Sequence, residues 1–204
     1  MSKDRLVAFT DAVLAIIITI LVLELPKPSS PSVDAILELK ESFYAYTLSF
    51  FWLGALWFGM YKIWSMVEKV DNKVIRWNIV LLFFASLIPY TTSLVSKYYD
   101  SSVIQALYGI VVILVTVSNV FLNKVIDEPN IANSELLKST KQFRSALIID
   151  GDIKAVGLLL TITVLPEAMM ISVLIAGIYI MLIDNKLNKQ KLKNRRREEK
   201  WKKI

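Results

Sequence analysis

An arginine and an aspartate stand inside an otherwise apolar run at the start of the chain, RLVAFTDAVLAIIITILVLEL, residues 5–25. A charged group at the centre of a bilayer costs roughly 2.5–3.5 kcal/mol on insertion scales, so each one calls for a structural or functional explanation. Arg5 and Asp11 are six residues apart, which is the wrong spacing for a pair within one helix. Two roles are open for Asp11. It is either a buried group that accepts hydrogen bonds from neighbouring helices and so fixes the register of its own helix, or it contacts a permeating ion. Its expected donors are Lys62, Trp77, Asn78 or Arg5 of an adjacent subunit.

Drawn as a helix, this run has two different faces. At 100° per residue, one set of side chains lies within about 60° of a single line, whereas Asp11 lies about 140° from Ile16. The set forms an apolar stripe interrupted by a single hydroxyl, and its members are Arg5, Phe9, Ala12, Ile16, Thr19, Ile20 and Leu23. The opposite face presents the carboxylate to neighbouring helices.

The composition narrows the classes of function. Hydrophobic residues make up 55% of the 204 residues, so the 24 basic and 18 acidic residues must be segregated from the apolar runs. The chain has no cysteine and no histidine. Thiolate chemistry is thereby excluded, and the commonest neutral-pH base and metal ligand is missing. No G-x-S-x-G or H-E-x-x-H motif occurs either, so an intramembrane enzyme is disfavoured and no cofactor is expected.

The rest of the chain predicts an all-α membrane protein with six transmembrane helices, since alternating barrel-type strands are absent. The first run ends in Glu24-Leu25-Pro26 instead of a small-residue cleavage site, which indicates a retained helix and not a signal peptide. Residues 1–185 form the expected transmembrane domain. The six apolar runs are 5–25, 43–66, 75–97, 102–123, 141–164 and 167–185.

Lysine and arginine counts predict the orientation. With the N-terminus inside, twenty of the 24 basic residues fall on the cytosolic side, which favours cytosolic placement of both ends. The expected domain is followed by a basic cytosolic tail over 186–204. Directly after a membrane span, such a tail sets topology or touches anionic lipid, and we do not expect a nucleic-acid partner.

The fifth run carries charges of its own. Asp150 and Lys154 are four residues apart and can pair along one helix face as a structural ion pair. The alternative is a polar stripe that lines a transport path. A secondary transporter would use these charges together with those of the first run, but no pair of Gly- or Pro-interrupted helices and no clear internal repeat supports it.

Two blocks resemble the endosomal and lysosomal potassium channel family called transmembrane protein 175. The first is Arg5, Phe9, Thr10 and Asp11 followed by AVLAIIITILVLEL, in which Thr10 replaces the serine of the family pattern. The second, VDNKVIRWNIVLLFFASLIPYTTSLV at 70–95, is similar to the third helix of the family, with Asn78 near its start. Together the blocks cover about a quarter of the chain.

The resemblance implies a homotetramer of six-helix subunits, with the first helices around a central pore and no re-entrant filter loop. It implies a hydrophobic constriction at Ile16, Ile20 and Leu23, and a selectivity layer at Thr19. Arg5, Phe9, Thr10, Asp11 and Asn78 would form a structural polar network. A ring of isoleucine side chains narrow enough to exclude water would gate by dewetting, and potassium would be favoured moderately because it dehydrates more easily than sodium.

One departure from the family lies in the second helix. Many members carry a histidine near its cytosolic end, whereas the corresponding segment here, FFWLGALWFGMYKIW at 50–64, has none. Tyr61 or Lys62 would have to replace it as a donor, and proton sensitivity through that histidine is not expected. The sequence thus predicts a potassium-favouring leak channel, not an enzyme, in the plasma membrane of a prokaryote, with potassium ions, lipid and its own copies as partners.

Overall fold

The first apolar run forms α1 (Lys3–Ile20), which tightens into a 3-10 turn, η1 (Leu21–Glu24), ahead of a proline-rich loop. The computed structural model describes residues 2–183, so the basic tail expected over 186–204 lies outside the described residues. A short helix that the sequence pattern did not predict, α2 (Val33–Leu37), follows the loop. The side chain of Ser32 caps it by accepting a hydrogen bond from the Ala35 amide at 3.2 Å.

The middle of the chain forms three helices, α3 (Lys40–Trp64), α4 (Asn72–Ser86) and α5 (Ile88–Lys97). The run over 75–97 was expected to be one helix, but it is divided at Leu87 between α4 and α5. The division follows from Pro89, which has no amide hydrogen to donate to the carbonyl four residues earlier. Asp71 caps α4 by accepting from the Val74 amide at 2.9 Å.

The last third of the chain contains α6 (Ser102–Asp127), the 3-10 turn η2 (Glu128–Asn130), α7 (Ser134–Thr163) and a final helix described over Ala168–Ile183. Leu165, Pro166 and Glu167 lie in the turn that was expected between the last two helices. Close packing of this final helix depends on two glycines, because a Cβ at Gly109 would lie 2.4 Å from the Met169 sulfur and one at Gly157 would lie 2.1 Å from Ser172 Oγ.

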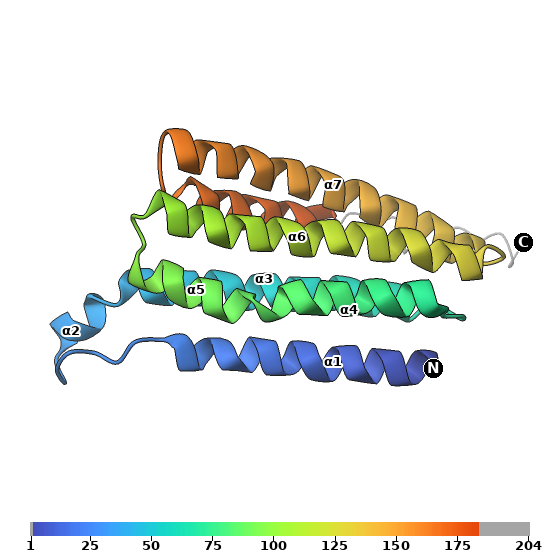
Figure 1. The fold of residues 1–204 in the computed structure, drawn as a ribbon, viewed down its shortest axis with the longest axis horizontal. Helices are drawn as coiled ribbons and strands as arrows, with labels where there is room; N and C mark the ends of the chain where they lie inside the picture. The colour runs from blue at the N-terminus through green and yellow to red at the C-terminus, as the bar shows by residue number, and fades with distance from the viewer. Residues whose placement is uncertain (1, 184–204) are drawn as a thin grey trace, which may run out of the picture.

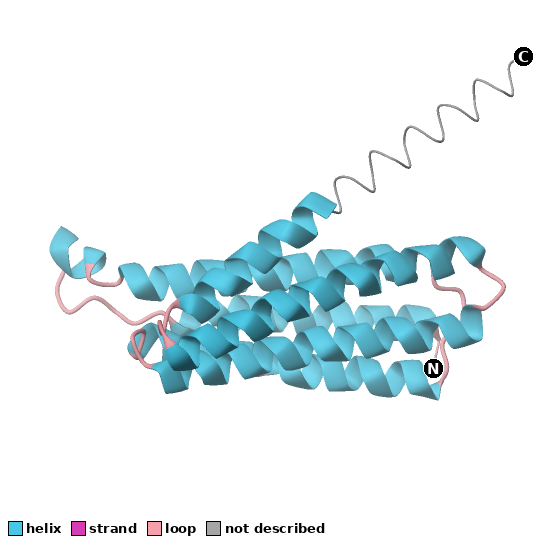
Figure 2. Cartoon of the chain, turned by 90° about the horizontal axis from the view of Figure 1, so that it is seen from above, coloured by secondary structure: helices cyan, strands magenta, loops and turns pink. Residues whose placement is uncertain are grey.

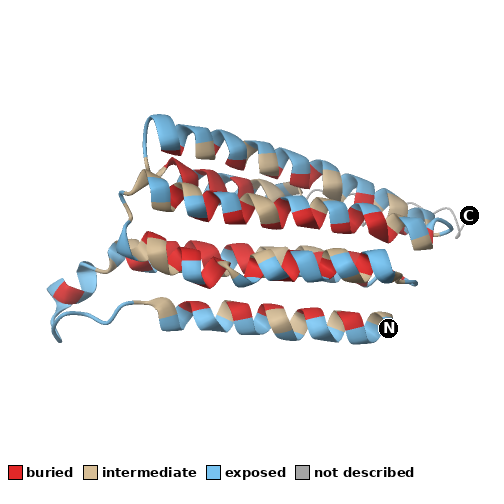
Figure 3. Ribbon diagram, viewed as in Figure 1, coloured by how far each residue is buried: buried red, intermediate tan, exposed pale blue. Residues whose placement is uncertain are grey.

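Most of the helices lie nearly along one direction (Figure 1), whereas the final helix crosses them obliquely in Figure 2. In Figure 1, α1 lies at one edge of the bundle, α3, α4 and α5 lie beside it, and α6 separates them from α7 at the opposite edge. Among the helices from α1 to α7, the most extensive packing joins α6 to α7 and α4 to α6. Figure 3 shows buried residues throughout the central helices, whereas α1 has its buried residues on the side that faces the bundle.

Three described helical segments are long and apolar enough to cross a membrane: Lys3–Glu24, Asn72–Lys97 and Ser102–Asn130. The helix Ala168–Ile183 is apolar but shorter. α3 and α7 are 25 and 30 residues long, but they are not among these three segments. The fold is therefore all-helical over the described residues, as expected, and the count of six spans stays a prediction.

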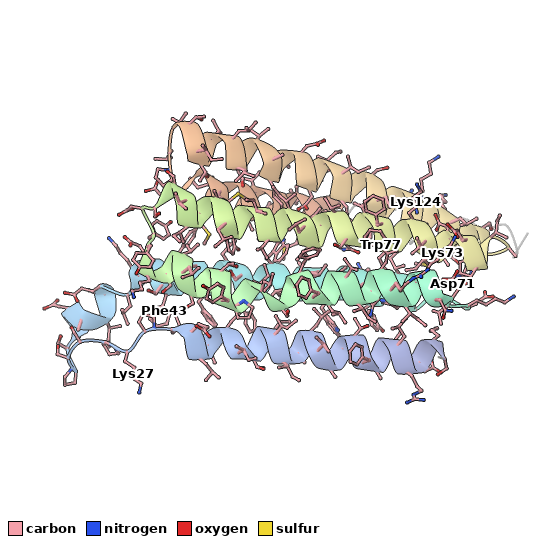
Figure 4. All side chains as sticks on the ribbon, viewed as in Figure 1. Lys27, Phe43, Asp71, Lys73, Trp77 and Lys124 are labelled. Carbon is pink, nitrogen blue, oxygen red and sulfur yellow. The ribbon has the colours of Figure 1, made fainter. Side chains whose placement is uncertain are left out.

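Figure 4 shows how charged and aromatic side chains are placed along the bundle. Asp71, Lys73 and Lys124 lie toward the end at which α1 begins, whereas Lys27 and Phe43 lie toward the other end. Lys73 pairs with Glu128 across the loops at 2.6 Å. Lysine side chains are therefore present at both ends of the bundle.

Candidate functional site

One face of α1 packs against the rest of the chain. Its buried residues recur at spacings of three and four, as in the contact face of a helix, and are Leu6, Thr10, Leu14 and Ile17, continued by Leu21 in η1. α1 packs against α3 and α4, and η1 packs against α5. This face fixes the rotation of α1, and with it the direction in which every other α1 side chain points.

The other face of α1 is exposed over its whole length in a single chain, and it contains the stripe that the sequence predicted. Ile16 is 57% exposed, Ile20 is 37% exposed and Leu23 in η1 is 78% exposed. Thr19 is also exposed, and its hydroxyl donates to the backbone carbonyl oxygens of Ala15 and Ile16 at 3.0 and 2.9 Å. Its oxygen therefore keeps lone pairs that can accept from water or face a cation.

Asp11 is held by a tryptophan on the neighbouring helix. Trp57 Nε1, on α3, donates a hydrogen bond to Asp11 Oδ1 at 2.9 Å. Trp57 was not among the expected donors. Trp77, which was, stacks on Phe121 of α6 with ring centroids 4.7 Å apart and planes 12° apart. An indole N–H is a donor only, so Trp57 suits a carboxylate partner.

Thr10 and Asn78 form a second link between α1 and its neighbours. Asn78 Nδ2, on α4, donates to Thr10 Oγ1 at 2.8 Å, and Thr10 Oγ1 donates to the Leu6 carbonyl oxygen at 2.8 Å. Both side chains are buried, at 0% and 2% exposure for Asn78 and Thr10. Arg5 and Phe9, the other two residues of the expected network, lie instead on the exposed face of α1.

A separate polar cluster lies between α6 and α7. Lys154 Nζ contacts Asp150 Oδ2 at 2.5 Å, which confirms the expected pairing of these two residues. Thr116 of α6 completes the cluster, because it donates to Asp150 Oδ2 at 3.1 Å and lies 3.0 Å from Lys154 Nζ. The Lys154 ammonium also lies over the ring of Trp52, 5.0 Å from its centroid.

The same interface contains a second ion pair that the sequence did not predict. Arg144 Nη1 contacts Asp127 Oδ2 at 2.5 Å and donates to the Asn123 carbonyl oxygen at 2.8 Å. Thr140 also donates to Asp127, at 2.6 Å. No local spacing could have revealed this pair, because Asp127 and Arg144 are 17 residues apart on different helices.

These polar groups do not assemble into a metal site: among residues 2–183, no three His, Cys, Asp or Glu side chains are grouped so that they could hold a metal ion. The charges of α1 and of α7 do not meet within one chain, because the two helices lie at opposite edges of the bundle (Figure 1). The arrangement combines an exposed apolar face on α1 with internally bonded polar clusters.

Comparisons with known proteins all point to one family of ion channels. A sequence model of the family described as endosomal/lysosomal potassium channel TMEM175 matches residues 5–89. A protein of Chryseobacterium sp. (strain P1-3), named a potassium channel, is 37% identical over 136 residues, which are 67% of this chain and 71% of that protein. One of Chamaesiphon minutus, also named a potassium channel, is 34% identical over 100 residues, which are 46% of this chain and 49% of that protein.

Similarity also extends to an animal protein and to a solved structure. The endosomal/lysosomal proton channel TMEM175 of Gallus gallus is 29% identical over 114 residues, which are 50% of this chain and 23% of that protein. The crystal structure of a lysosomal potassium-selective channel TMEM175 homologue from Chamaesiphon minutus superposes with a TM-score of 0.70 at 23% identity, and covers 90% of this chain and 98% of that one. The two chains therefore share a fold.

Proposed function

The chain belongs to the TMEM175 family of membrane ion channels, and from that premise we propose that it is a cation leak channel that moderately favours potassium. Ions cross passively, and no cofactor takes part. The exposed stripe on α1 is the single observation that carries this proposal. In a family of channels, an apolar face with one hydroxyl layer that stays exposed in the described part of the chain is suited to line a pore.

The pore is completed by other copies of the chain. One α1 cannot enclose a channel by itself, so we propose a homotetramer of six-helix subunits with four α1 helices around the axis and no re-entrant filter loop. The exposed side chains of Ile16, Ile20 and Leu23 then form successive hydrophobic rings. The hydroxyl oxygens of Thr19 form a polar layer between the first two rings.

In this proposal, ions pass only when water fills the hydrophobic constriction. Rings of isoleucine exclude water when they are narrow, and conduction requires them to widen until a partly hydrated cation passes. The Thr19 oxygens replace part of the lost hydration, which favours the cation that dehydrates more easily. The buried face of α1 sets the rotation of the stripe, since Trp57 holds Asp11 and Asn78 holds Thr10 from the side away from the pore.

We further propose that the channel lies in the plasma membrane of a prokaryote with both ends cytosolic, and that its basic tail over 186–204 touches anionic lipid. The charge bias of the sequence supports this orientation. The end of the bundle at which α1 begins carries Lys73 and Lys124 (Figure 4), and it is the cytosolic end in this orientation.

The decisive experiment measures potassium and sodium flux from liposomes that contain the purified protein. Ile16→Asn should wet the constriction and raise potassium flux several-fold over the wild type. The matched control is Ile148→Asn, because Ile148 is similarly exposed at 53% but lies on α7, away from the proposed pore. It should leave flux unchanged.

Two results would contradict the proposal. If well-folded Ile16→Asn left conductance and selectivity unchanged, the assignment of the pore-lining face would be wrong. Flux that requires a second ion gradient would indicate the alternative, a secondary transporter that uses charges of α1 and α7. The separation of those charges within one chain disfavours the transporter.

A further inference from the structure

A buried amide on α6 has hydrogen-bonding capacity that residues 2–183 do not use. Asn119 is 1% exposed, and its Nδ2 has no hydrogen-bond partner among these residues. Its Oδ1 and its carbonyl oxygen both accept from Asn123, so only the donor side of the amide is unused. A buried donor without a partner costs about 1–3 kcal/mol, which makes it a strong candidate to bind something else.

Asn119 lines a small recess, a cavity of about 30 Å³ between α3, α6, α7 and the final helix. Its other polar walls are Thr116, Asp150 and Lys154, which already bond to one another. The Asp150–Lys154 pair carries no net charge, so the recess favours a neutral polar group over an ion. Because the unused atom is a donor, the group must be an acceptor such as a hydroxyl or carbonyl oxygen.

A larger apolar groove adjoins the recess. It has a volume of about 390 Å³, lies between α3, α7 and the final helix, and shares Ala55, Phe143 and Ile180 with the walls of the recess. Phe50, Phe51 and Phe58 contribute aromatic walls, and Gln142 is its one amide. A cavity of this size with apolar walls and a few placed polar groups is typical of a small-ligand site.

We propose that the groove and the recess together bind a neutral alkyl amphiphile, whose chain lies in the groove and whose hydroxyl or carbonyl oxygen accepts from Asn119 Nδ2. The site is formed by α3, α6, α7 and the final helix, and α1 contributes no residue to it. It is therefore independent of the proposed pore. A ligand of this class reaches the groove from the hydrocarbon of the membrane.

Two glycines allow the site to be filled without disturbing the fold. Gly54 lines the groove and Gly177 lines the recess, and a Cβ added at either position would meet no atom within 4 Å. Gly177→Val should occupy the recess, and Gly54→Leu should occupy the groove. Gly151→Ala is the matched control, because its Cβ would make an ordinary 3.7 Å contact with Thr116 and Gly151 does not line either space.

The test uses a photoreactive diazirine analogue of 1-decanol with the purified full-length protein in lipid nanodiscs, and maps labelled peptides by mass spectrometry. We expect labelling of 50–59, 142–146 and 177–183. Excess 1-decanol should compete at least tenfold better than decane, which has no oxygen. Labelling should fall at least tenfold in Gly177→Val, in Gly54→Leu and in Asn119→Leu, and should stay unchanged in Gly151→Ala.

Two outcomes would overturn the proposal. Labelling that persists in both glycine variants would place the probe elsewhere. Equal competition by decane and decanol would mean that Asn119 does not anchor an oxygen and that the recess holds only water. If Asn119→Leu fails to fold, the glycine variants and the comparison of the two competitors still decide the question. Ion flux is not the readout, so failure of the channel proposal would leave this result intact.

Discussion

The exposed face of α1 and the interface between α6 and α7 place their side chains in opposite ways. The α1 face presents apolar side chains outward, and within residues 2–183 Ile16 and Leu23 remain exposed. At the α6–α7 interface, Asp150 and Lys154 are almost completely buried and are bonded to each other and to Thr116. We propose that other copies of the chain complete the first region, whereas the charged groups of the second region find their partners within a single chain.

Because of this difference, substitutions in the two regions should affect different properties of the protein. Substitutions on the exposed α1 face should change permeation and assembly while leaving the folded subunit intact. Substitutions in the α6–α7 interface should change the free energy of unfolding, because each removed partner leaves a buried charge behind. The α1 links to Trp57 and Asn78 lie between these extremes, since they join α1, the proposed pore-lining helix, to the bundle.

The largest expected loss of stability follows from substitution of Lys154. Lys154→Met leaves the Asp150 carboxylate buried without its cation and should lower the free energy of unfolding by about 3–5 kcal/mol. Denaturant unfolding followed by circular dichroism in detergent measures it. The control is the double variant Asp150→Leu/Lys154→Met, which should recover most of the loss because an apolar pair often replaces a buried ion pair without cost. Equal loss in both variants would show that the charge pairing is not what stabilises this interface.

A smaller loss of stability is expected when the hydrogen bond between α1 and α4 is removed. Thr10→Val keeps the shape of the side chain but leaves Asn78 Nδ2 without its acceptor, and should cost about 1–3 kcal/mol. Thr10→Ser retains the hydroxyl and serves as the control. The same unfolding measurement distinguishes them, and a serine variant as unstable as the valine variant would indicate that packing, not the hydrogen bond, matters at this position.

The smallest effect is expected at the surface of the bundle. Lys73 and Glu128 pair at 2.6 Å, but their side chains are 55% and 50% exposed. Lys73→Ala should therefore cost only about 0.2–1 kcal/mol, and added salt should weaken the contribution of the pair in the wild type. Unfolding at low and high ionic strength measures both. A loss as large as that of Lys154→Met would break the distinction between buried and exposed pairs.

Sequence reasoning worked best where the signal lies within one helix. The 3.6-residue period separated the exposed stripe of α1 from its other face, and the spacing of four predicted the Asp150–Lys154 pair. The all-helical fold followed from apolar runs of near-bilayer length. The division of residues 75–97 was missed although Pro89 was visible, because proline in a membrane helix either kinks it or ends it, and the surrounding packing decides which.

Hydrogen-bond and ion-pair partners on different helices could not be predicted from the sequence. Trp57 lies 46 residues from Asp11, and Asp127 lies 17 residues from Arg144, so no local pattern connects them. Trp57 lies in the segment 50–64, in which we expected only Tyr61 or Lys62 as a donor. The recess beside Asn119 arises where four helices meet, and no single segment predicts it.

The sequence by itself determined the periodicities: which side chains of α1 share a face and which residues can pair four apart. These are properties of one helix, fixed by backbone geometry that is the same in every protein. Only the tertiary structure decided that α1 turns the Thr10 face inward, that Trp57 holds Asp11, and that Asn119 is left with a spare donor. Those outcomes depend on which helices pack together and at what rotation, because a buried polar group is satisfied by whichever partner the packed bundle brings within reach.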